Sequence, residues 1–128
     1  MNCYCGNEKP YANCCGKAHK DLSKAKTAEQ LMRSRYSAFV LANGDYLMAT
    51  HHTSTRPIKE KKAIVNWAKS VKWIKLEVLE TSEGQENDTK GTVTFNAYFF
   101  ENGKVDMIHE KSAFVRENNL WSYLGLSK

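Results

Sequence analysis

Four cysteines lie within the first 15 residues of this 128-residue chain, and no cysteine follows them. Cys3, Cys5, Cys14 and Cys15 form two close pairs separated by a short loop. Two such pairs can supply the four thiolates of a tetrahedral Zn²⁺ site, because the metal keeps each bound cysteine deprotonated at neutral pH. A zinc ion whose four positions are all filled by protein ligands is structural. The spacing therefore predicts a structural Zn²⁺ site near the N-terminus.

Several alternatives to this ligand set remain open from the sequence. His19 lies four residues after Cys15 and could replace it as the fourth ligand. Four thiolates also suit iron, so the spacing does not choose between the two metals. A disulfide is a competing explanation, although the adjacency of Cys14 and Cys15 weighs against it. A redox thiol pair is another, although a redox motif would usually read C-x-x-C beside a βαβ unit. The first residues contain no basic region followed by an apolar stretch, so we expect a reducing, cytoplasmic location.

A glycine directly follows each cysteine pair, Gly6 after the first and Gly16 after the second. Glycine permits a positive φ angle, which a tight turn around a metal commonly needs. Residues 1–18 offer little apolar surface beyond two tyrosines. We therefore expect this segment to keep its shape only when it holds a metal ion.

The run from Cys3 to Gly16 resembles the SEC-C motif, the zinc-binding tail of the bacterial preprotein translocase ATPase SecA. The matching positions are Cys3, Cys5, Gly6, Lys9, Tyr11, Cys14 and Cys15. The resemblance implies a zinc knuckle over residues 1–20. It also implies a protein partner in the export machinery or the ribosome. The side chains expected to face such a partner are Lys9, Tyr11, Lys17 and Lys20.

Charge is distributed unevenly along the chain. The net charge is +3 over residues 1–26, +6 over residues 27–75 and −4 over residues 76–128. The basic part suits an acidic partner, and RNA binding through this region is one alternative. No DNA-binding motif and no apolar run long enough to span a membrane are present. With 41% hydrophobic residues and 11% aromatic residues, the composition excludes a disordered or low-complexity chain.

The middle of the chain has the patterns of helices. Thr27 and Gln30 have the spacing of a helix capping box, and apolar residues at helical spacing predict a helix that continues to about Ala42. Arg35 falls on nearly the same face as this apolar stripe, so it needs a carboxylate or carbonyl partner. Asp45 begins a short helix, and a third helix is expected from Pro57 to about Ser70.

From Val71 onward the apolar period changes to two, which is typical of strands. Ile74, Leu76 and Val78 alternate with other residues on the first of four expected strands. Asn102-Gly103 is a strong hairpin signal between the second and third strands. Helices followed by an antiparallel meander predict an α+β fold, with the N-terminal helices packed on a curved antiparallel sheet.

Two further stretches resemble the bacterial YchJ family of small SEC-C proteins. They are residues 33–39 with residues 46–47 and 50–52, and residues 110–117 with Trp121. The resemblance implies that residues 27–128 form a cone of the nuclear-transport-factor-2-like (cystatin-like) type. It implies no established activity.

Cones of this superfamily include enzymes with acid and base residues in their cavities. The corresponding candidates here are Arg35, Tyr36, Asp45, His51, His52, Trp67 and His109. No nucleophile elbow, phosphate-binding glycine loop or dinucleotide fingerprint accompanies them. The sequence assigns no catalytic residue and favours a zinc-knuckle interaction module. The alternative is a small-molecule-binding or enzymatic cone with a pocket near Arg35, His51 and His52.

Overall fold

The computed structural model describes residues 1–127 and confirms the predicted α+β architecture. The helices and single helical turns precede the sheet: η1 (Tyr11–Asn13), α1 (Cys15–Lys20), η2 (Leu22–Lys24), α2 (Ala28–Val40), α3 (Gly44–Ala49), η3 (Ile58–Glu60) and α4 (Lys61–Ser70). The strands are β1 (Lys72–Glu83), β2 (Lys90–Glu101), β3 (Lys104–Glu117) and β4 (Leu120–Leu126). All neighbouring strands are antiparallel, in the order β1-β2-β3-β4.

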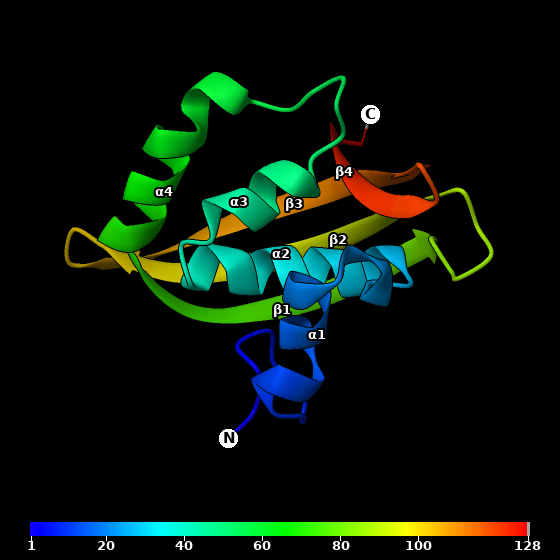
Figure 1. Ribbon diagram of the computed structural model, residues 1–128. Helices are drawn as coiled ribbons and strands as arrows, with labels where there is room; N and C mark the ends of the chain where they lie inside the picture. The colour runs from blue at the N-terminus through cyan, green and yellow to red at the C-terminus, as the bar shows by residue number, and fades with distance from the viewer. Residues whose placement is uncertain (128) are drawn as a thin grey trace.

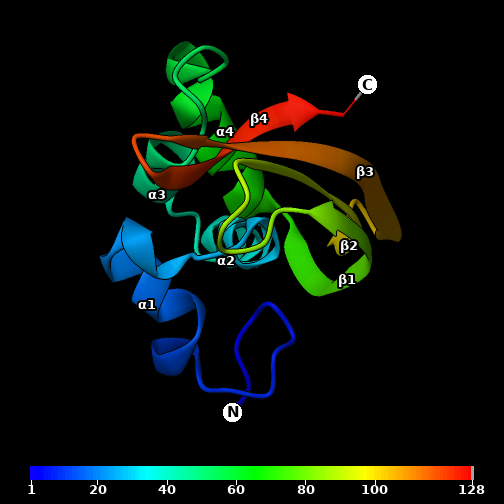
Figure 2. The same cartoon turned by 90° about the vertical axis from the view of Figure 1, so that its right-hand side faces the viewer.

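The sheet curves around α2, which lies across its concave face (Figures 1 and 2). The N-terminal segment forms a small lobe on the other side of α2, away from α3 and α4 (Figure 1). Helix α2 therefore has two roles, because it fills the cone and also carries the lobe that contains the cysteines.

Helix α2 begins where the capping signal predicts. The hydroxyl of Thr27 accepts a hydrogen bond from the Gln30 backbone N–H at 3.1 Å, while the Gln30 side chain accepts one from Lys26 N–H at 2.8 Å. The helix ends at Val40, slightly before the predicted end, and Ala42 then has a φ of 54°. Asn43 caps α3 by accepting a hydrogen bond from the Tyr46 N–H.

The core joins α2 to the inner face of the sheet. Its buried members include Leu31, Met32 and Tyr36 from α2, and Val93 and Phe95 from β2. Strand β2 alternates as predicted, with every second side chain buried. The tight turns at 102–103 and 118–119 have positive φ at both central residues, which is the two-residue turn that suits antiparallel hairpins.

Strand β1 departs from the simple alternation. Its pairing with β2 shifts register between Trp73 and Lys75 and again between Val78 and Glu80. These irregularities turn Ile74 outward, where it is 48% exposed, and bring Trp73 against the core. The prediction that Ile74 shares a face with Leu76 and Val78 is therefore wrong, because an extra residue in a strand reverses the alternation.

The free edge of β4 pairs with the segment that follows α3. Tyr123 N–H donates to the Thr50 carbonyl at 2.8 Å, and the His52 N–H donates to the Tyr123 carbonyl at 2.8 Å. The Trp121 indole N–H also donates to the Lys26 carbonyl at 3.0 Å. These bonds tie the end of the chain to both flanks of α2.

Candidate metal centre

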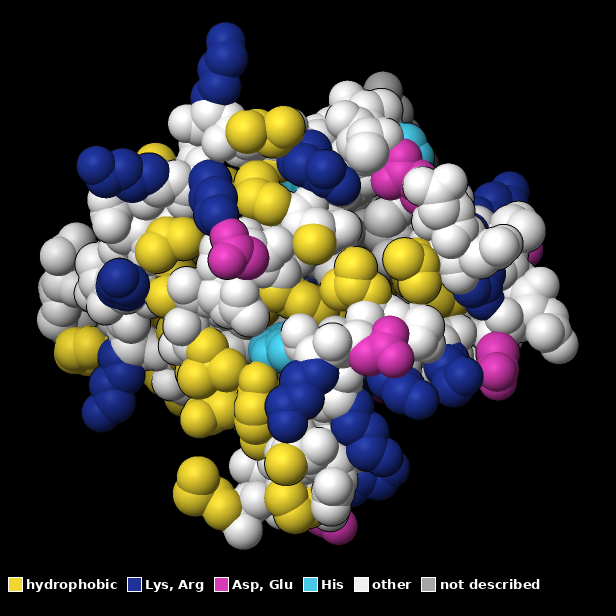
Figure 3. Space-filling view, in the orientation of Figure 1, with side chains coloured by type: hydrophobic (Ala, Val, Ile, Leu, Met, Phe, Trp, Pro, Cys, Tyr) yellow, Lys and Arg dark blue, Asp and Glu magenta, His cyan; other side chains and the backbone are white. Residues whose placement is uncertain are grey.

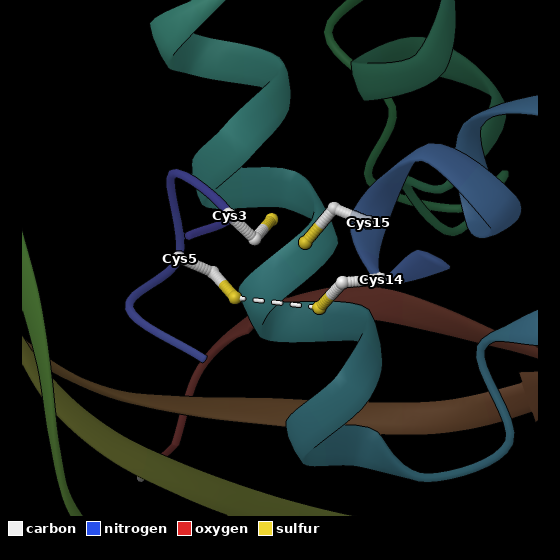
Figure 4. A group of neighbouring side chains, drawn as sticks. All are labelled: Cys3, Cys5, Cys14 and Cys15. Atoms are coloured by element: carbon white, nitrogen blue, oxygen red, sulfur yellow. Dashed lines mark hydrogen bonds between the residues drawn. The ribbon is translucent and has the colours of Figure 1, made fainter. Parts of the chain in front are cut away.

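The four cysteines meet in one cluster. Their sulfur atoms all lie within 4.8 Å of one another, and Figure 4 shows that they point toward a common centre. Cys3 and Cys5 come from the N-terminal loop, while Cys14 and Cys15 come from the start of α1. Three of the four side chains are buried. The topology thus unites the two pairs that are separated in sequence.

The spacing of the sulfur atoms fits a tetrahedral metal site. Sulfur atoms 2.3 Å from a central zinc ion lie about 3.8 Å apart when the tetrahedron is regular. The Sγ atoms of Cys5 and Cys14 are 3.8 Å apart. A disulfide needs an S–S distance near 2.05 Å, and all four cysteines are free. The cluster therefore has the donor set and the dimensions that suggest a metal site.

Hydrogen bonds within the lobe hold the two pairs in place. Cys3 N–H donates to the Lys9 carbonyl at 2.7 Å, and Gly6 N–H donates to the Cys3 carbonyl at 3.1 Å. Gly6 has a φ of 95°, as predicted. The Asn7 amide donates to the sulfur of Cys14 at 3.4 Å, which stabilises a thiolate at that position.

The predicted positive φ at Gly16 is wrong, because this glycine lies within α1. Glycine is needed there for a different reason. A Cβ atom at position 16 would lie 2.7 Å from the carbonyl oxygen of Tyr11. The close approach of α1 to the preceding turn therefore requires a residue without a side chain.

Helix α2 anchors the cysteine lobe with polar side chains one turn apart. Arg33 donates from Nη1 to the Cys5 carbonyl at 2.8 Å and forms an ion pair with Glu29 at 2.9 Å. The fully buried Ser37 hydroxyl lies 3.8 Å from the sulfur of Cys3. Neither residue was among the site residues expected from the sequence. Arg33 and Ser37 are four residues apart, so they lie on one face of the helix, the face opposite the sheet. Two polar residues at this spacing are the sequence signal that points to a supporting role.

The thiols influence one another strongly when no metal is bound. A hydrogen bond from Cys15, opposed by burial, lowers the pKa of the Cys5 thiol to about 5. The same contact, together with burial, raises the pKa of Cys15 well above its ordinary value. The protein environment thus already favours one thiolate in the cluster.

His19 lies beside the cluster but is fully engaged elsewhere. Its Nε2–H donates to the Ser34 carbonyl at 2.8 Å, so Nδ1 is the acceptor for the Tyr11 hydroxyl at 2.6 Å. Burial lowers the pKa of His19, which keeps the ring neutral in this arrangement. The ring contacts both the lobe and α2, and the Tyr46 ring packs against it at a tilt of 54°, with the ring centroids 4.4 Å apart. It acts as a packing and hydrogen-bonding spacer.

The candidate residues of the cone are not gathered into one site. Arg35, Tyr36 and Trp67 line a cavity between α2, α4 and the sheet, but His51 and His52 are not among its lining residues. His51 packs edge-on against Tyr123 because the chain turns there to pair with β4. The predicted grouping of Arg35 with His51 and His52 around a pocket is therefore wrong for the two histidines.

The other polar candidates lie on the surface. Asp45 is exposed and pairs with Lys61, and His52 pairs with Glu117 at 3.6 Å. His109 is exposed on β3, where its Nδ1 lies 2.6 Å from the Asn96 side-chain oxygen. Arg35 finds the carbonyl partner that its position required, at Leu47.

Residues 27–125 match the family described as YchJ, middle NTF2-like domain. The chain belongs to the YchJ family. A UPF0225 protein of Chromobacterium violaceum is 46% identical over 123 residues, covering 95% of this chain and 89% of the relative. A UPF0225 protein of Vibrio cholerae is 40% identical over 124 residues, covering 97% of this chain and 81% of the relative.

Two solved structures share the whole arrangement of this YchJ-family chain. The solution structure of RPA3114, a SEC-C motif containing protein from Rhodopseudomonas palustris, matches with a TM-score of 0.88 and 33% identity, covering 99% of this chain and 98% of that one. The crystal structure of a SEC-C motif containing protein from Psychrobacter arcticus matches with a TM-score of 0.80 and 33% identity, covering 99% and 81%. The predicted combination of a SEC-C knuckle with an NTF2-like domain is confirmed.

No helix within residues 1–127 combines the length and the apolar character that crossing a bilayer requires. The predicted domain of residues 27–128 ends on Lys128, which lies outside the described residues. Its boundary with the knuckle at residues 1–20 stays a prediction.

Proposed function

We propose that Cys3, Cys5, Cys14 and Cys15 bind one structural Zn²⁺ ion and that the resulting knuckle is a docking module for an acidic protein segment. The observation that supports the docking role is a hollow beside Cys14 and Cys15. Its cationic lining consists of Lys9, Lys17, Lys24, Lys26 and Arg33. Lys and Arg side chains are gathered along one flank of the N-terminal lobe in Figure 3.

Most of this positive charge is free to meet a partner. Arg33 is paired with Glu29, and Lys26 lies 4.0 Å from Glu86. Lys9, Lys17 and Lys24 are exposed and have no ion-pair partner within residues 1–127. A zinc ion with four thiolates carries a net charge of −2, so bound metal lowers but does not cancel the charge of the hollow.

The lining also favours a protein over RNA. Besides its cations, the hollow presents the amide side chains of Asn7, Asn13 and Gln30, and none of the described lining residues is aromatic. Recognition of single-stranded RNA relies on bases stacked on aromatic rings. Carboxylates of Asp and Glu need only cations and amide donors, which this surface supplies.

Binding to defined probes tests the docking role. A labelled peptide rich in Glu and a single-stranded RNA of equal charge are titrated with the metal-loaded protein by fluorescence anisotropy. We expect the peptide to bind more tightly, and Lys17→Glu/Lys24→Glu to weaken it at least roughly tenfold. The matched control is Lys62→Glu/Lys69→Glu, which makes the same charge change on exposed residues of α4. Equal losses in both variants, or tighter binding of the RNA, would refute the proposal.

Metal content tests the zinc assignment separately. Elemental analysis of reduced, folded protein should find one zinc equivalent per chain, and Cys3→Ser/Cys14→Ser should lose it. Iron in place of zinc, or much less than one equivalent of metal, would overturn the assignment. Capture from a lysate, with the unmodified protein and the Cys3→Ser/Cys14→Ser variant as baits, then tests whether the acidic partner belongs to the ribosome or to the export machinery.

A further inference from the structure

A cavity of about 140 Å³ lies inside the cone, and none of its lining residues belongs to the cysteine lobe. Its walls are mainly aromatic, with Tyr36 from α2, Trp67 from α4 and Trp73 from β1. An engineered apolar cavity of roughly 150 Å³ binds one benzene molecule. The present cavity therefore has room for a single six-membered ring, and aromatic walls suit a planar one.

Arg35 brings a buried positive charge to this cavity. The residue is only 8% exposed, and its Nη1 donates to the Leu47 carbonyl and the Thr50 hydroxyl, each at 2.8 Å. Its Nε and Nη2 atoms have no hydrogen-bond partner within residues 1–127. In that part of the chain no fully enclosed side-chain nitrogen or oxygen lacks a partner, so Nε and Nη2 each keep some accessible surface. Burial lowers the pKa of Arg35 to about 10, which leaves it charged at neutral pH.

Glu110 places an acceptor on the same cavity. One of its carboxylate oxygens, Oε2, accepts a hydrogen bond from the Ser112 hydroxyl at 3.2 Å. Its Oε1 accepts none within residues 1–127. Although Glu110 and Arg35 both line the cavity, no ion pair within 4.0 Å joins them in the described chain. A donor and an acceptor thus face one cavity without satisfying each other.

We propose that the cavity binds a small, neutral, planar ring that carries a carbonyl next to an N–H group, as in a lactam. The carbonyl accepts from Arg35, the N–H donates to Glu110, and the ring packs against Trp67 and Trp73. Arg35 would attract an aromatic anion, but Glu110 would repel it. Glu110 would attract an aromatic cation, but Arg35 would repel it. The two separate, opposite charges on the cavity wall therefore select a neutral ligand that has both an acceptor and a donor.

The three tryptophans of the chain provide the readout. The indole N–H signals of Trp67 and Trp73 report on the cavity, whereas Trp121 is absent from its lining and donates to the Lys26 carbonyl. Protein labelled with ¹⁵N is titrated with 2-pyridone, benzoate, benzylammonium and benzene in parallel. We expect 2-pyridone to shift the signals of Trp67 and Trp73 at the lowest concentration and to leave that of Trp121 in place. Equal affinity for benzene, or no shift at either cavity tryptophan, would overturn the proposal.

Glu110→Gln separates the lactam assignment from a general apolar pocket. Glu110 is partly exposed and forms no buried ion pair in the described chain, so the variant should fold. Removing the negative charge should strengthen benzoate binding, and the preference for 2-pyridone over benzoate should fall at least roughly tenfold. An unchanged preference would contradict the role of Glu110. Arg35→Met, checked for folding by the same spectrum, should weaken the binding of 2-pyridone by a similar factor.

Discussion

The hydroxyl of Tyr11 donates to Nδ1 of His19 across 2.6 Å. The other nitrogen of the ring is bound to the Ser34 carbonyl, so both nitrogens of His19 are in use. We therefore expect Cys15, which is buried within the cluster, to be the fourth ligand of the proposed zinc site.

His19→Gln is therefore expected to keep a full metal equivalent while lowering the free energy of unfolding. Loss of buried hydrogen bonds of this kind costs about 1–3 kcal/mol. Cys15→Ser, in contrast, should reduce the metal content. Elemental analysis and thermal unfolding of the two variants measure both effects. Loss of the metal from His19→Gln with retention in Cys15→Ser would assign the fourth position to the histidine.

Arg33 should support metal binding without contacting the ion. Arg33→Met removes the bond to the Cys5 carbonyl, and the loss of such supporting contacts typically lowers metal affinity roughly ten- to hundredfold. Glu29→Gln is the matched control, because it removes the ion pair and leaves the bond to Cys5. Competition with a chromophoric chelator measures both affinities. An equal loss in the control would show that the ion pair, not the carbonyl contact, matters.

Gly84 should tolerate substitution less well than Gly103. Both have positive φ, so alanine strains the backbone at either position. A Cβ atom at position 84 would also lie 2.6 Å from the Cβ of Ala28, whereas nothing lies within 4 Å at position 103. We expect Gly84→Ala to lower the free energy of unfolding by about 2 kcal/mol more than Gly103→Ala, measured by urea denaturation. Equal losses would mean that α2 can move away from this turn.

His51 should make the fold less stable in mild acid. Burial, with Arg35 and Arg56 nearby, lowers the pKa of His51 from 6.5 to about 4 in the folded state. The unfolded chain therefore binds a proton first, so the stabilisation is complete above pH 6.5 and is lost as the pH falls toward 4. Protonation of His51 lowers the free energy of unfolding by at most about 3 kcal/mol.

The variant His51→Gln should flatten this dependence when the free energy of unfolding is measured from pH 7 to pH 4. His109→Gln serves as the control, because His109 is exposed on β3. A slope that His51→Gln leaves unchanged would assign the acid sensitivity to other groups.

Local signals in the sequence predicted much of this architecture. The capping spacing of Thr27 and Gln30 located the start of α2, and Asn102-Gly103 located a hairpin, because both depend on hydrogen bonds or φ angles of adjacent residues. The sequence also predicted that the four cysteines come together, because metal ligands are recognised by their residue type and spacing. These features need no knowledge of how distant elements pack.

The features that the sequence did not reveal depend on packing between distant elements. The outward turn of Ile74 follows from register shifts between β1 and β2, which a period of two cannot anticipate. Arg33 and Ser37 support the cysteine lobe only because the lobe docks on that face of α2. His51 lies outside the cavity because pairing with β4 fixes the course of the chain there.

The pairing of Tyr123 with residues 50–52 has a consequence for self-association. An uncovered strand edge is a template on which further copies of a chain can add and build fibres. Here Tyr123 of β4 already exchanges backbone hydrogen bonds with Thr50 and His52 on the outer side of the strand. The opposite edge, β1, carries the exposed charges of Lys72, Lys75 and Glu80. Backbone pairing at Tyr123 interrupts one edge and charged side chains line the other, so we expect both edges to be poor templates for the addition of another strand.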